Sequence, residues 1–325
     1  MCGLTGFHFR DGETTSDAIT IQSMTAAQLH RGPDDAGHVA IHCPSGRIET
    51  LESKGAASFR SAADLFFGFR RLSILDLSLN GHQPMASPDG QVILMLNGEI
   101  YNAFDFVREL ESKGCRFRGR SDTEVVLSLY RIYGLEKMLS RLNGMFSIVI
   151  YDSRLGQLFL ARDRFGIKPL YILENERFFA FSSELKSFGY LPNFQFVLDE
   201  RELSEFVLFR HNRERTLLKG IRQLEPGTVL SYDPTIGVSR ETTYETETTK
   251  QTIERPEQFA ASLKQAVEAQ LISDVPLGCQ LSGGVDSSLV THYAARRAGA
   301  NMNTVSIVFA DERFTEESHI NYVEQ

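Results

Sequence analysis

The sequence predicts an α+β protein built on antiparallel sheets, followed by the beginning of an α/β unit. Three observations indicate this. Many short strand-like segments and only a few helical ones fill the first 230 or so residues. A polar, threonine-rich stretch at 242–250 then interrupts the pattern. Beyond it, a strand, a Ser-Gly-Gly loop, a helix and a second strand follow one another across 275–310, which is typical of an α/β unit.

Length and composition favour small-molecule chemistry. A chain of 325 residues suggests roughly two domains, and 42% hydrophobic residues are enough for packed cores. The net charge of −8 and the lack of a basic run disfavour a nucleic-acid partner. The N-terminus lacks a secretory signal, and no apolar run is long enough for a membrane span, so we expect a cytoplasmic protein without a membrane role.

The cysteines point to a reducing compartment. Their wide spacing gives neither a CxxC pair nor a dense disulfide pattern, so free thiols are expected. They are Cys2, Cys43, Cys115 and Cys279.

The start of the chain, Met1-Cys2-Gly3, is a candidate nucleophile. Removal of Met1 would give Cys2 both a thiol and a free α-amine. An α-amine titrates at about 7.7–8.0, so it can accept the thiol proton directly or through a water. Taken alone, a second-position cysteine is more often a packed or lipidated residue.

The first segments alternate between strands, helix and turn. Residues 4–9 alternate as a strand, which would hold Cys2 at the end of a sheet. A helical stretch spans 16–29, and the charged Gly-Pro segment at 30–35 is a turn. The apolar run beginning at Leu65 predicts a buried strand that ends in charged residues near Asp76.

The segment 92–102 is an apolar strand interrupted by Asn97-Gly98. Asn-Gly strongly favours a tight hairpin turn, and on these residues alone the turn is the preferred interpretation. The functional alternative is an oxyanion hole, in which the Asn97 amide and the Gly98 N–H bind a developing negative charge.

Helices and further strands complete the first part. A helix is expected from Asn102 to Lys113, and a second from Val125 to Tyr133 with Ser121 or Asp122 as its N-cap. Helix capping alone would explain Asp122. The remaining expected elements are strands at 145–151, 157–162 and 178–182, a helix at 200–209, a turn entering a strand at 224–230, and a helix from Pro256.

The second informative stretch runs from Val275 to Ser288. A strand enters the loop Ser282-Gly283-Gly284, which opens a helix ending near Ala295 with Gly299 as C-cap, and a strand follows at 303–310. Such a loop points backbone N–H groups and a helix N-terminus at an anion. It is not a Walker A loop, because no Gly-Lys-Ser/Thr follows. A serine- and glycine-rich turn without function is the alternative.

Residues 2–230 resemble the class II glutamine amidotransferase domain of glutamine-hydrolysing asparagine synthetases. The resemblance implies an N-terminal-nucleophile sandwich of stacked antiparallel sheets flanked by helices. It implies that Cys2 attacks the side-chain amide of glutamine, that Asn97 and Gly98 form the oxyanion hole, that Arg71 holds the α-carboxylate, and that Asp122 and Glu99 hold the α-ammonium. The motifs that carry it are Met1-Cys2-Gly3, His30 to Asp35, Arg71 to Ile74, Asn97 to Asn102, Ser121 to Glu124, and Arg162 to Tyr171.

Residues 256–325 resemble the start of an ATP-pyrophosphatase domain, joined to the first domain by a linker at 231–255. Ser-Gly-Gly-Val-Asp-Ser-Ser matches the pyrophosphate loop of that family. The resemblance implies ATP as co-substrate with Mg²⁺ bridging its phosphates, Asp286 helping to place the metal, and no organic prosthetic group. The residues expected to contact ATP are Leu281, Ser282, Gly283, Gly284, Asp286, Ser287, Ser288 and Ile307.

Together the two sites imply that ammonia from glutamine passes inside the protein to a carboxylate activated as an acyl-adenylate, which in this family is aspartate. The segment after the linker is much shorter than the family's synthetase domain. We therefore expect these residues alone to hydrolyse glutamine but not to make asparagine. A homodimer, or a separate chain completing the domain, is possible.

Three other functions are compatible with parts of the sequence. A related amidotransferase would deliver ammonia to a sugar acid or a peptide carboxylate. Glucosamine-phosphate synthases and amidophosphoribosyltransferases share the first domain but lack the 282–288 motif. A non-catalytic binding module is the alternative of another class.

Overall fold

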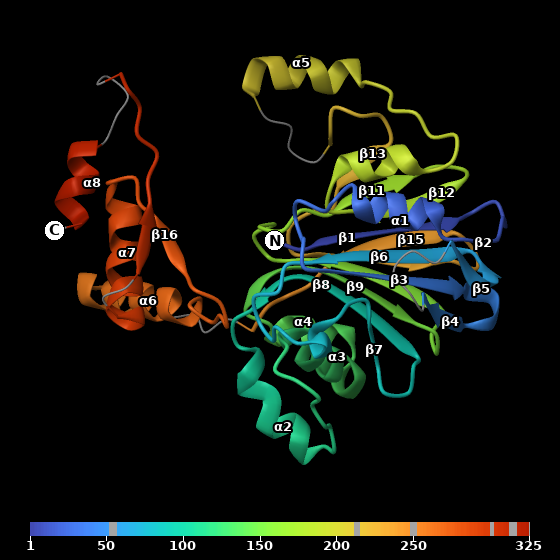
Figure 1. The fold of residues 1–325 in the computed structure, drawn as a ribbon, viewed down its shortest axis with the longest axis horizontal. Helices are drawn as coiled ribbons and strands as arrows, with labels where there is room; N and C mark the ends of the chain where they lie inside the picture. The colour runs from blue at the N-terminus through green and yellow to red at the C-terminus, as the bar shows by residue number, and fades with distance from the viewer. Residues whose placement is uncertain (52–56, 211–214, 248–251, 300–301, 312–316, 325) are drawn as a thin grey trace. The chain divides into compact units, whose positions relative to one another are not determined.

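The computed structural model describes residues 1–325 except 52–56, 211–214, 248–251, 300–301, 312–316 and 325 (Figure 1). The chain divides into two compact units, Met1–Glu247 and Thr248–Gln325. Each unit is described by itself.

The first unit contains a seven-stranded antiparallel sheet. The expected strand after Met1-Cys2 forms its centre, with β1 between β12 and β6. The strand order is β13-β11-β12-β1-β6-β3-β4. Their bounds are β1 Gly3–Phe9, β3 Asp35–His42, β4 Arg47–Thr50, β6 Leu65–Arg71, β11 Tyr171–Glu174, β12 Phe178–Ser182 and β13 Ile221–Gln223.

A second, six-stranded antiparallel sheet has the order β15-β14-β10-β9-β8-β7. Its long central pair, β8 and β9, is in register from one end to the other. The strands are β7 Met85–Ala86, β8 Val92–Ile100, β9 Gly144–Asp152, β10 Gln157–Arg162, β14 Thr228–Asp233 and β15 Val238–Thr243. A small separate ribbon pairs β2 Thr15–Asp17 with β5 Ser58–Ala63.

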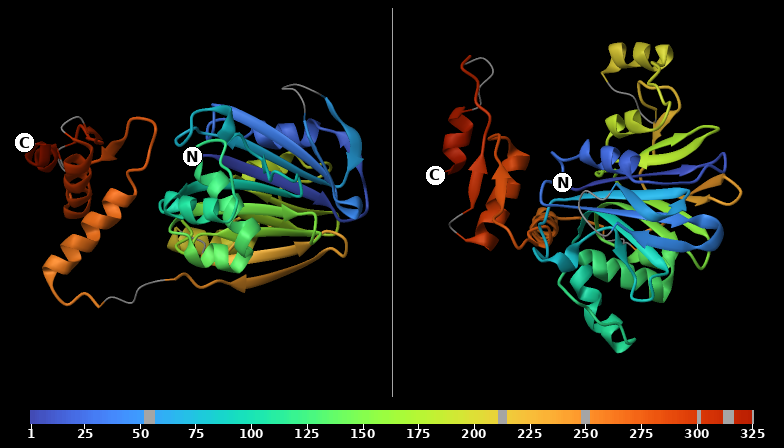
Figure 2. Two further views of the ribbon diagram at one scale, coloured as in Figure 1. Left: turned by 90° about the horizontal axis from the view of Figure 1, so that it is seen from below. Right: turned by 45° about the vertical axis from the view of Figure 1, so that its right-hand side comes forward.

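The two sheets stack face to face and helices cover their outer faces, as the views in Figure 2 show. Alternation along each strand creates the layers, because successive side chains point to opposite faces. On β6, Leu65 and Phe67 join the core between the sheets, whereas Phe66 joins the core under α1. On β8, Ile93 faces the other sheet and Leu94 faces the helices. The predicted sandwich is thereby confirmed.

The helices lie close to where the sequence placed them. Ser121 caps α3 by accepting a hydrogen bond from the Thr123 N–H, as expected. The helix predicted at 102–113 is a 3-10 turn followed by a short α-helix. The bounds are α1 Ile19–Ala26, η1 Cys43–Ser45, η2 Leu79–Gly81, η3 Ala103–Phe106, α2 Val107–Ser112, α3 Asp122–Tyr133, α4 Leu135–Arg141, η4 Leu185–Tyr190 and α5 Glu200–Phe209.

The second unit holds one parallel β-α-β motif. β16 pairs with β17, and α7 connects them, as the pattern of this segment predicts. The strand expected at 303–310 is shorter, because regular pairing ends at Val305. The bounds are α6 Pro256–Ala269, β16 Gly278–Gln280, α7 Val285–Ala298, β17 Asn303–Val305 and α8 Glu317–Glu324.

The linker predicted at 231–255 starts too early. β14 continues to Asp233 and β15, Val238–Thr243, pairs with it along its whole length. Of the threonines that suggested a linker, Thr242 and Thr243 lie on this exposed edge strand, where β-branched residues suit the backbone and polar side chains meet water. The part of the predicted linker that falls at 248–251 lies outside the described residues.

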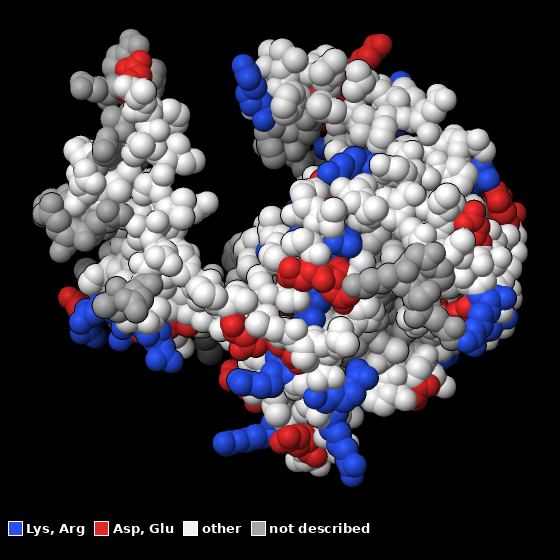
Figure 3. Space-filling model, in the orientation of Figure 1, with Lys and Arg blue, Asp and Glu red and all other residues white. Residues whose placement is uncertain are grey.

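The surface charge of the first unit is mixed on the face drawn in Figure 3, where Lys and Arg alternate with Asp and Glu. Among the described residues, no helix is long and apolar enough to cross a membrane.

Candidate active site

Three of the expected site residues meet between the two sheets because of strand alternation. Cys2, Arg71 and Asn97 each lie two positions from a residue of the inter-sheet core, so their side chains point into the same space. The register of β1 and β6 pairs Gly3 with Arg70, which brings Cys2 and Arg71 to the same end of the sheet.

Cys2 and Arg71 line a small pocket with a volume of about 20 Å³, and Asn97 lies between two of its lining residues along β8. That volume holds about one water molecule, so a larger ligand requires the walls to move. The lining residues are Cys2, Arg71, Leu72, Ile74, Leu75, Gln83, Leu96, Gly98, Glu99, Ser121, Asp122 and Thr123.

The Cys2 thiol is half-buried and held by the backbone of Leu72. Its Sγ accepts a hydrogen bond from the Leu72 N–H at 3.4 Å and lies 3.6 Å from the Leu72 oxygen, to which it can donate. Burial raises the pKa of the thiol, while the Leu72 N–H opposes that shift. The terminal α-amine belongs to Met1, and burial lowers its pKa. Cys2 therefore needs a base to become a nucleophile near neutral pH.

Asn97 is completely buried on β8. Its Nδ2 donates to the Ser183 hydroxyl at 3.4 Å, a long hydrogen bond, and its Oδ1 has no hydrogen-bond partner among the described residues. A buried amide with incomplete hydrogen bonding is costly unless another group binds it. The atom without a partner is an acceptor, so binding an oxyanion would fall to the N–H groups of Nδ2 and not to Oδ1.

The Gly98 N–H points away from β9. The N–H groups of Leu96 and Ile100 donate to the Gln83 side chain and to Asp122, so both point toward the β7 side of the strand. Alternate residues share this direction, which aims the Gly98 N–H the same way, at the pocket wall. Asn97 and Gly98 do not form a hairpin turn, because β8 continues to Ile100. The preferred interpretation as a turn is wrong.

Glu99 and Asp122 form a pair of carboxyl groups at the other side of the pocket. Asp122 accepts hydrogen bonds from the N–H groups of Ile100 and Thr123, at 3.0 and 2.8 Å. Burial raises the pKa of Asp122 despite these bonds. Burial, with the nearby Asp122 charge, raises the pKa of Glu99 to about 8, and the Lys168 charge opposes this shift. Such a pair can accept a cationic group in place of a proton.

Arg71 reaches the pocket, but its guanidinium is occupied by the backbone. It donates to the carbonyl oxygens of Ser78 at 2.9 Å and of Leu75 at 3.0 Å, and also to that of Asp76. The side chain thus holds the segment 72–78 over Cys2.

Two charged residues near Cys2 were given no role by the sequence. Arg31 donates from Nε to the Cys2 carbonyl oxygen at 2.9 Å, which fixes the N-terminal backbone. Lys168 is buried and its charge acts on both Cys2 and Glu99, and burial lowers its pKa. Arg31 lies in the motif His30 to Asp35, and Lys168 lies in the motif Arg162 to Tyr171. A charged residue within a glycine-containing turn was the sequence feature that could have identified them.

In the second unit, the expected ATP residues form a loop at the start of α7. Ser287 and Ser288 both donate to the Gly284 carbonyl oxygen, at 3.1 and 2.7 Å, and the hydroxyls of Ser282 and Ser287 are 3.0 Å apart. Gly283 has a positive φ of 78°, which favours glycine. Asp286 lies exposed in the first turn of the helix.

The two apolar residues expected at ATP are placed differently. Leu281 is buried and its N–H donates to the Val305 carbonyl oxygen at 3.1 Å, which ties the start of the loop to β17. Ile307 is 78% exposed beyond the end of β17.

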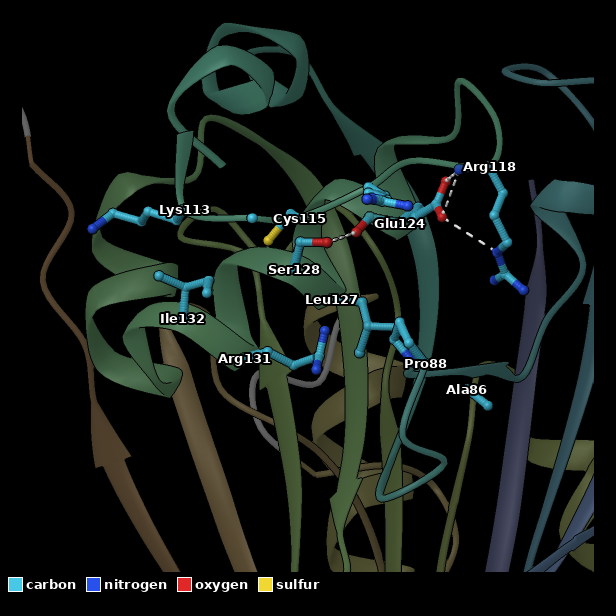
Figure 4. A pocket seen from close by; sticks show the side chains of 12 residues that line it. Ala86, Pro88, Lys113, Cys115, Arg118, Glu124, Leu127, Ser128, Arg131 and Ile132 are labelled. Atoms are coloured by element: carbon cyan, nitrogen blue, oxygen red, sulfur yellow. Dashed lines mark hydrogen bonds and ion pairs between the residues drawn. The ribbon is translucent and has the colours of Figure 1, made fainter. Parts of the chain in front are cut away.

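A larger pocket, of about 350 Å³, lies beside α3 and contains none of the expected site residues (Figure 4). Leu127, Ser128 and Arg131 of α3 form one wall, and Arg118 turns toward Glu124 at its rim.

Comparison with known families matches both units. A profile described as a glutamine amidotransferase domain matches residues 1–244, and one described as asparagine synthase matches residues 258–325.

Individual relatives agree. The glutamine-hydrolysing asparagine synthetase 1 of Bacillus subtilis is 33% identical over 97% of this chain and 47% of its own length. Asparagine synthetase 3 of the same organism is 32% identical over 96% and 48%, and the amidase chyE of Penicillium rubens is 29% identical over 98% and 48%. The chain thus spans about half the length of the curated relatives it matches.

Among solved structures, glutamine phosphoribosylpyrophosphate amidotransferase from B. subtilis matches with a TM-score of 0.55 and 17% identity, covering 97% of this chain and 68% of that one. At this identity the match supports the fold alone.

Proposed function

The chain belongs to the family of glutamine amidotransferase domains, and from this premise we propose that its first unit hydrolyses glutamine to glutamate and ammonia at Cys2. The observation that carries the proposal is a single pocket lined by a thiol and a carboxyl pair, with the buried Asn97 amide adjacent in the chain to two of its lining residues, Leu96 and Gly98. These are the groups needed to attack a carboxamide, to stabilise its oxyanion and to bind an α-ammonium.

The proposed reaction begins when the α-amine of processed Cys2 takes the thiol proton. The sulfur attacks the carboxamide carbon, and the negative oxygen accepts hydrogen bonds from the Asn97 amide and the Gly98 N–H. The amine returns the proton to the leaving nitrogen, which departs as ammonia. Water then cleaves the thioester and releases glutamate.

Substrate orientation would come from the two poles of the pocket. Arg71 would exchange the backbone carbonyls of 75–78 for the α-carboxylate of glutamine, because a guanidinium fork binds a carboxylate bidentately. Glu99 and Asp122 would bind the α-ammonium. This exchange would release the segment 72–78 and enlarge the small pocket.

The direct test combines intact mass with a glutaminase assay. We expect the purified chain to lack Met1 and to release ammonia from glutamine, and Cys2→Ala to abolish that release. Cys115→Ala, which removes a thiol that does not line the pocket of Cys2, is the matched control and should retain activity. A chain that keeps Met1 and is still active would refute the role of the Cys2 amine.

For a chain that carries a complete asparagine synthase domain, we propose that the ammonia amidates aspartate through an acyl-adenylate. The asparagine synthase profile over 258–325 and the names of the bacterial relatives support this. ATP would bind at Ser282–Ser288, where backbone N–H groups and the start of α7 suit phosphates. Asp286 is suited to hold Mg²⁺, which commonly uses one or two carboxylates together with substrate phosphates.

A second acceptor class is favoured by the amidase names among relatives of similar identity. In this alternative, ammonia is delivered to another carboxylate, such as a sugar acid or a peptide. ATP-dependent pyrophosphate release by the full-length protein with a panel of carboxylates distinguishes the two. Release with aspartate alone supports asparagine synthesis, and release with another acid alone refutes it.

A further inference from the structure

A buried cluster of three potential metal ligands lies away from Cys2. His8, Cys43 and Asp64 each offer one ligand atom, and these atoms lie within 4.8 Å of one another. The residues are 3%, 9% and 7% exposed. His8 is six residues along β1 from Cys2, about 20 Å at the rise of a strand, so the cluster takes no part in the proposed glutamine reaction.

The His8 ring is held by a hydrogen bond of the kind found behind metal-binding histidines. Its Nδ1 lies 2.9 Å from the Tyr232 hydroxyl, and the Tyr232 ring stacks on Phe179 with centroids 3.9 Å apart. In the tautomer in which Nδ1–H donates to Tyr232, Nε2 presents its lone pair to Asp64, whose Oδ2 is 3.9 Å away.

Hydrogen bonds with the backbone hold Asp64, and among the described residues it forms no ion pair with Lys or Arg. Its main chain bonds β1 and β3, through Phe9 N–H to its oxygen at 2.9 Å and its own N–H to Ile41 at 3.1 Å. Oδ1 accepts from the Cys43 N–H at 2.8 Å, which leaves Oδ2 toward His8. A buried carboxylate beside a neutral imidazole is expensive unless a cation compensates it.

An independent observation comes from the opposite sheet. The Tyr151 side chain of β9 is completely buried, its hydroxyl lies next to the Cys43 thiol, and that hydroxyl has no other hydrogen-bond partner among the described residues. The neutral Cys43 thiol is a weak hydrogen-bond acceptor. A thiolate would accept a hydrogen bond from Tyr151 far better.

We propose that His8, Cys43 and Asp64 bind a structural zinc ion between the two sheets. The mixed nitrogen, sulfur and oxygen set is typical of zinc, and a water would complete four-coordination. Zn²⁺ displaces the Cys43 thiol proton to solvent, and the thiolate and carboxylate balance its charge. The three ligands need to close by about 1 Å to reach zinc distances. The Tyr151 hydroxyl then hydrogen-bonds the Cys43 sulfur, and the Tyr232 hydroxyl hydrogen-bonds the His8 imidazole, without either of them contacting the metal.

The test measures metal in the full chain produced with supplemental zinc. Wild type should carry about one zinc ion per chain after dialysis against a weak chelator, and Cys43→Ser and His8→Asn should carry almost none. Cys2→Ser and Cys115→Ser are matched thiol controls and should keep the zinc. Refolding in Co²⁺ should give a thiolate-to-cobalt charge-transfer band that disappears in Cys43→Ser alone among the cysteine variants.

The wild-type measurements decide the proposal even where a variant does not fold. A wild-type chain without zinc and without the cobalt–thiolate band would overturn it. So would zinc that remains in Cys43→Ser, or that is lost in Cys2→Ser. Glutaminase activity is recorded separately, since an inactive chain that binds zinc would count against the proposed reaction and not against this site.

Discussion

At the scale of single residues, the carboxyl pair of Glu99 and Asp122 gives the site a pH dependence. Burial raises both pKa values, and repulsion from Asp122 adds to the rise at Glu99, to about 8, so the free site holds a proton near pH 7. An ammonium group lowers the pKa of a neighbouring carboxyl. Glutamine binding to the unreactive Cys2→Ala variant should therefore release up to about one proton at pH 7 and tighten as pH rises toward 8.

Titration calorimetry in two buffers of different ionisation enthalpy measures that release. Glu99→Gln removes the titrating group, so its binding heat should no longer depend on the buffer, although affinity falls. A buffer-independent heat for Cys2→Ala itself would show that the pair is already ionised, and the prediction would fail.

The same raised pKa values affect stability. A carboxyl whose pKa is raised in the folded state binds its proton more tightly than in the unfolded chain. Its stabilising contribution is complete below the unfolded value of about 4.3 and is lost as pH rises through about 8. Urea unfolding of wild type and Glu99→Gln from pH 5 to 8 should show a decline in the free energy of unfolding that is smaller in the variant. Equal declines would contradict the assignment.

Asn97 is expected to act mainly in the transition state. Removing its amide in Asn97→Ala should lower kcat about 100- to 1000-fold with a smaller change in KM, because the oxyanion exists only after attack. Asn102→Ala is a control from the same motif, since that side chain bonds backbone groups of Arg141 and Asn143 outside the pocket. Steady-state kinetics that show a KM effect alone for Asn97→Ala would refute the oxyanion role.

The sequence predicted residues with a familiar chemical function better than those that act through position. Cys2 and Asp122 line one pocket, and Asn97 lies on β8 between two of its lining residues. Arg31 and Lys168 were missed because their roles depend on contacts with the N-terminal segment, which are set by the fold rather than by local spacing. Arg71 was expected to bind the α-carboxylate of glutamine. In the structure its guanidinium donates hydrogen bonds to carbonyl oxygens of the segment 72–78.

At the scale of elements, β8 shows why local turn propensity failed. Asn-Gly favours a hairpin only when the chain can reverse, and here β9 pairs with β8 on both sides of the dipeptide. Gly98 is required for a different reason: a Cβ there would lie 2.0 Å from the Met145 oxygen and 2.7 Å from the Phe146 Cα. Long-range pairing of this kind is not visible in a single sequence.

Gly98→Ala should therefore force β8 and β9 apart. We expect a loss of about 1–3 kcal/mol in the free energy of unfolding, together with loss of most glutaminase activity, because the Gly98 N–H moves. Gly90→Ala is a stability control: Gly90 has φ +70° and open space around it, so alanine adds backbone strain without touching the pocket. Urea melts and ammonia release check both variants. Full activity in Gly98→Ala would argue against the oxyanion hole.

At the scale of the whole molecule, the order of motifs predicted the two units but not their exact boundary. The sandwich follows from strands whose side chains point alternately to opposite faces, and this alternation is visible in the sequence of each strand. The order of strands in each sheet is not visible there, because β1 lies between β6 and β12 and these pairing partners are distant in the chain. The boundary was misplaced because edge strand β15 has the polar composition of a linker.

All members of the three hydrophobic cores lie between Cys2 and Tyr244 in the sequence. The first unit therefore contains its own stabilising interior. In the second unit the described buried apolar residues are few, whereas Ile307, Val285 and Phe309 are 78%, 75% and 56% exposed. A core of that size does not stabilise a chain of this length well. Residues 1–247 alone should therefore unfold in one cooperative transition and keep glutaminase activity within about twofold of the full chain.

Residues 256–325 alone should bind a hydrophobic dye such as ANS and lack a sharp thermal transition, because much of their apolar surface meets water. Circular dichroism melts, dye binding and ammonia release on the two fragments and the full chain measure this. The full chain serves as the reference for both. If residues 1–247 aggregated or lost activity while the full chain stayed active, the second unit would be part of the folding core of the first, and the division into two units would be mistaken.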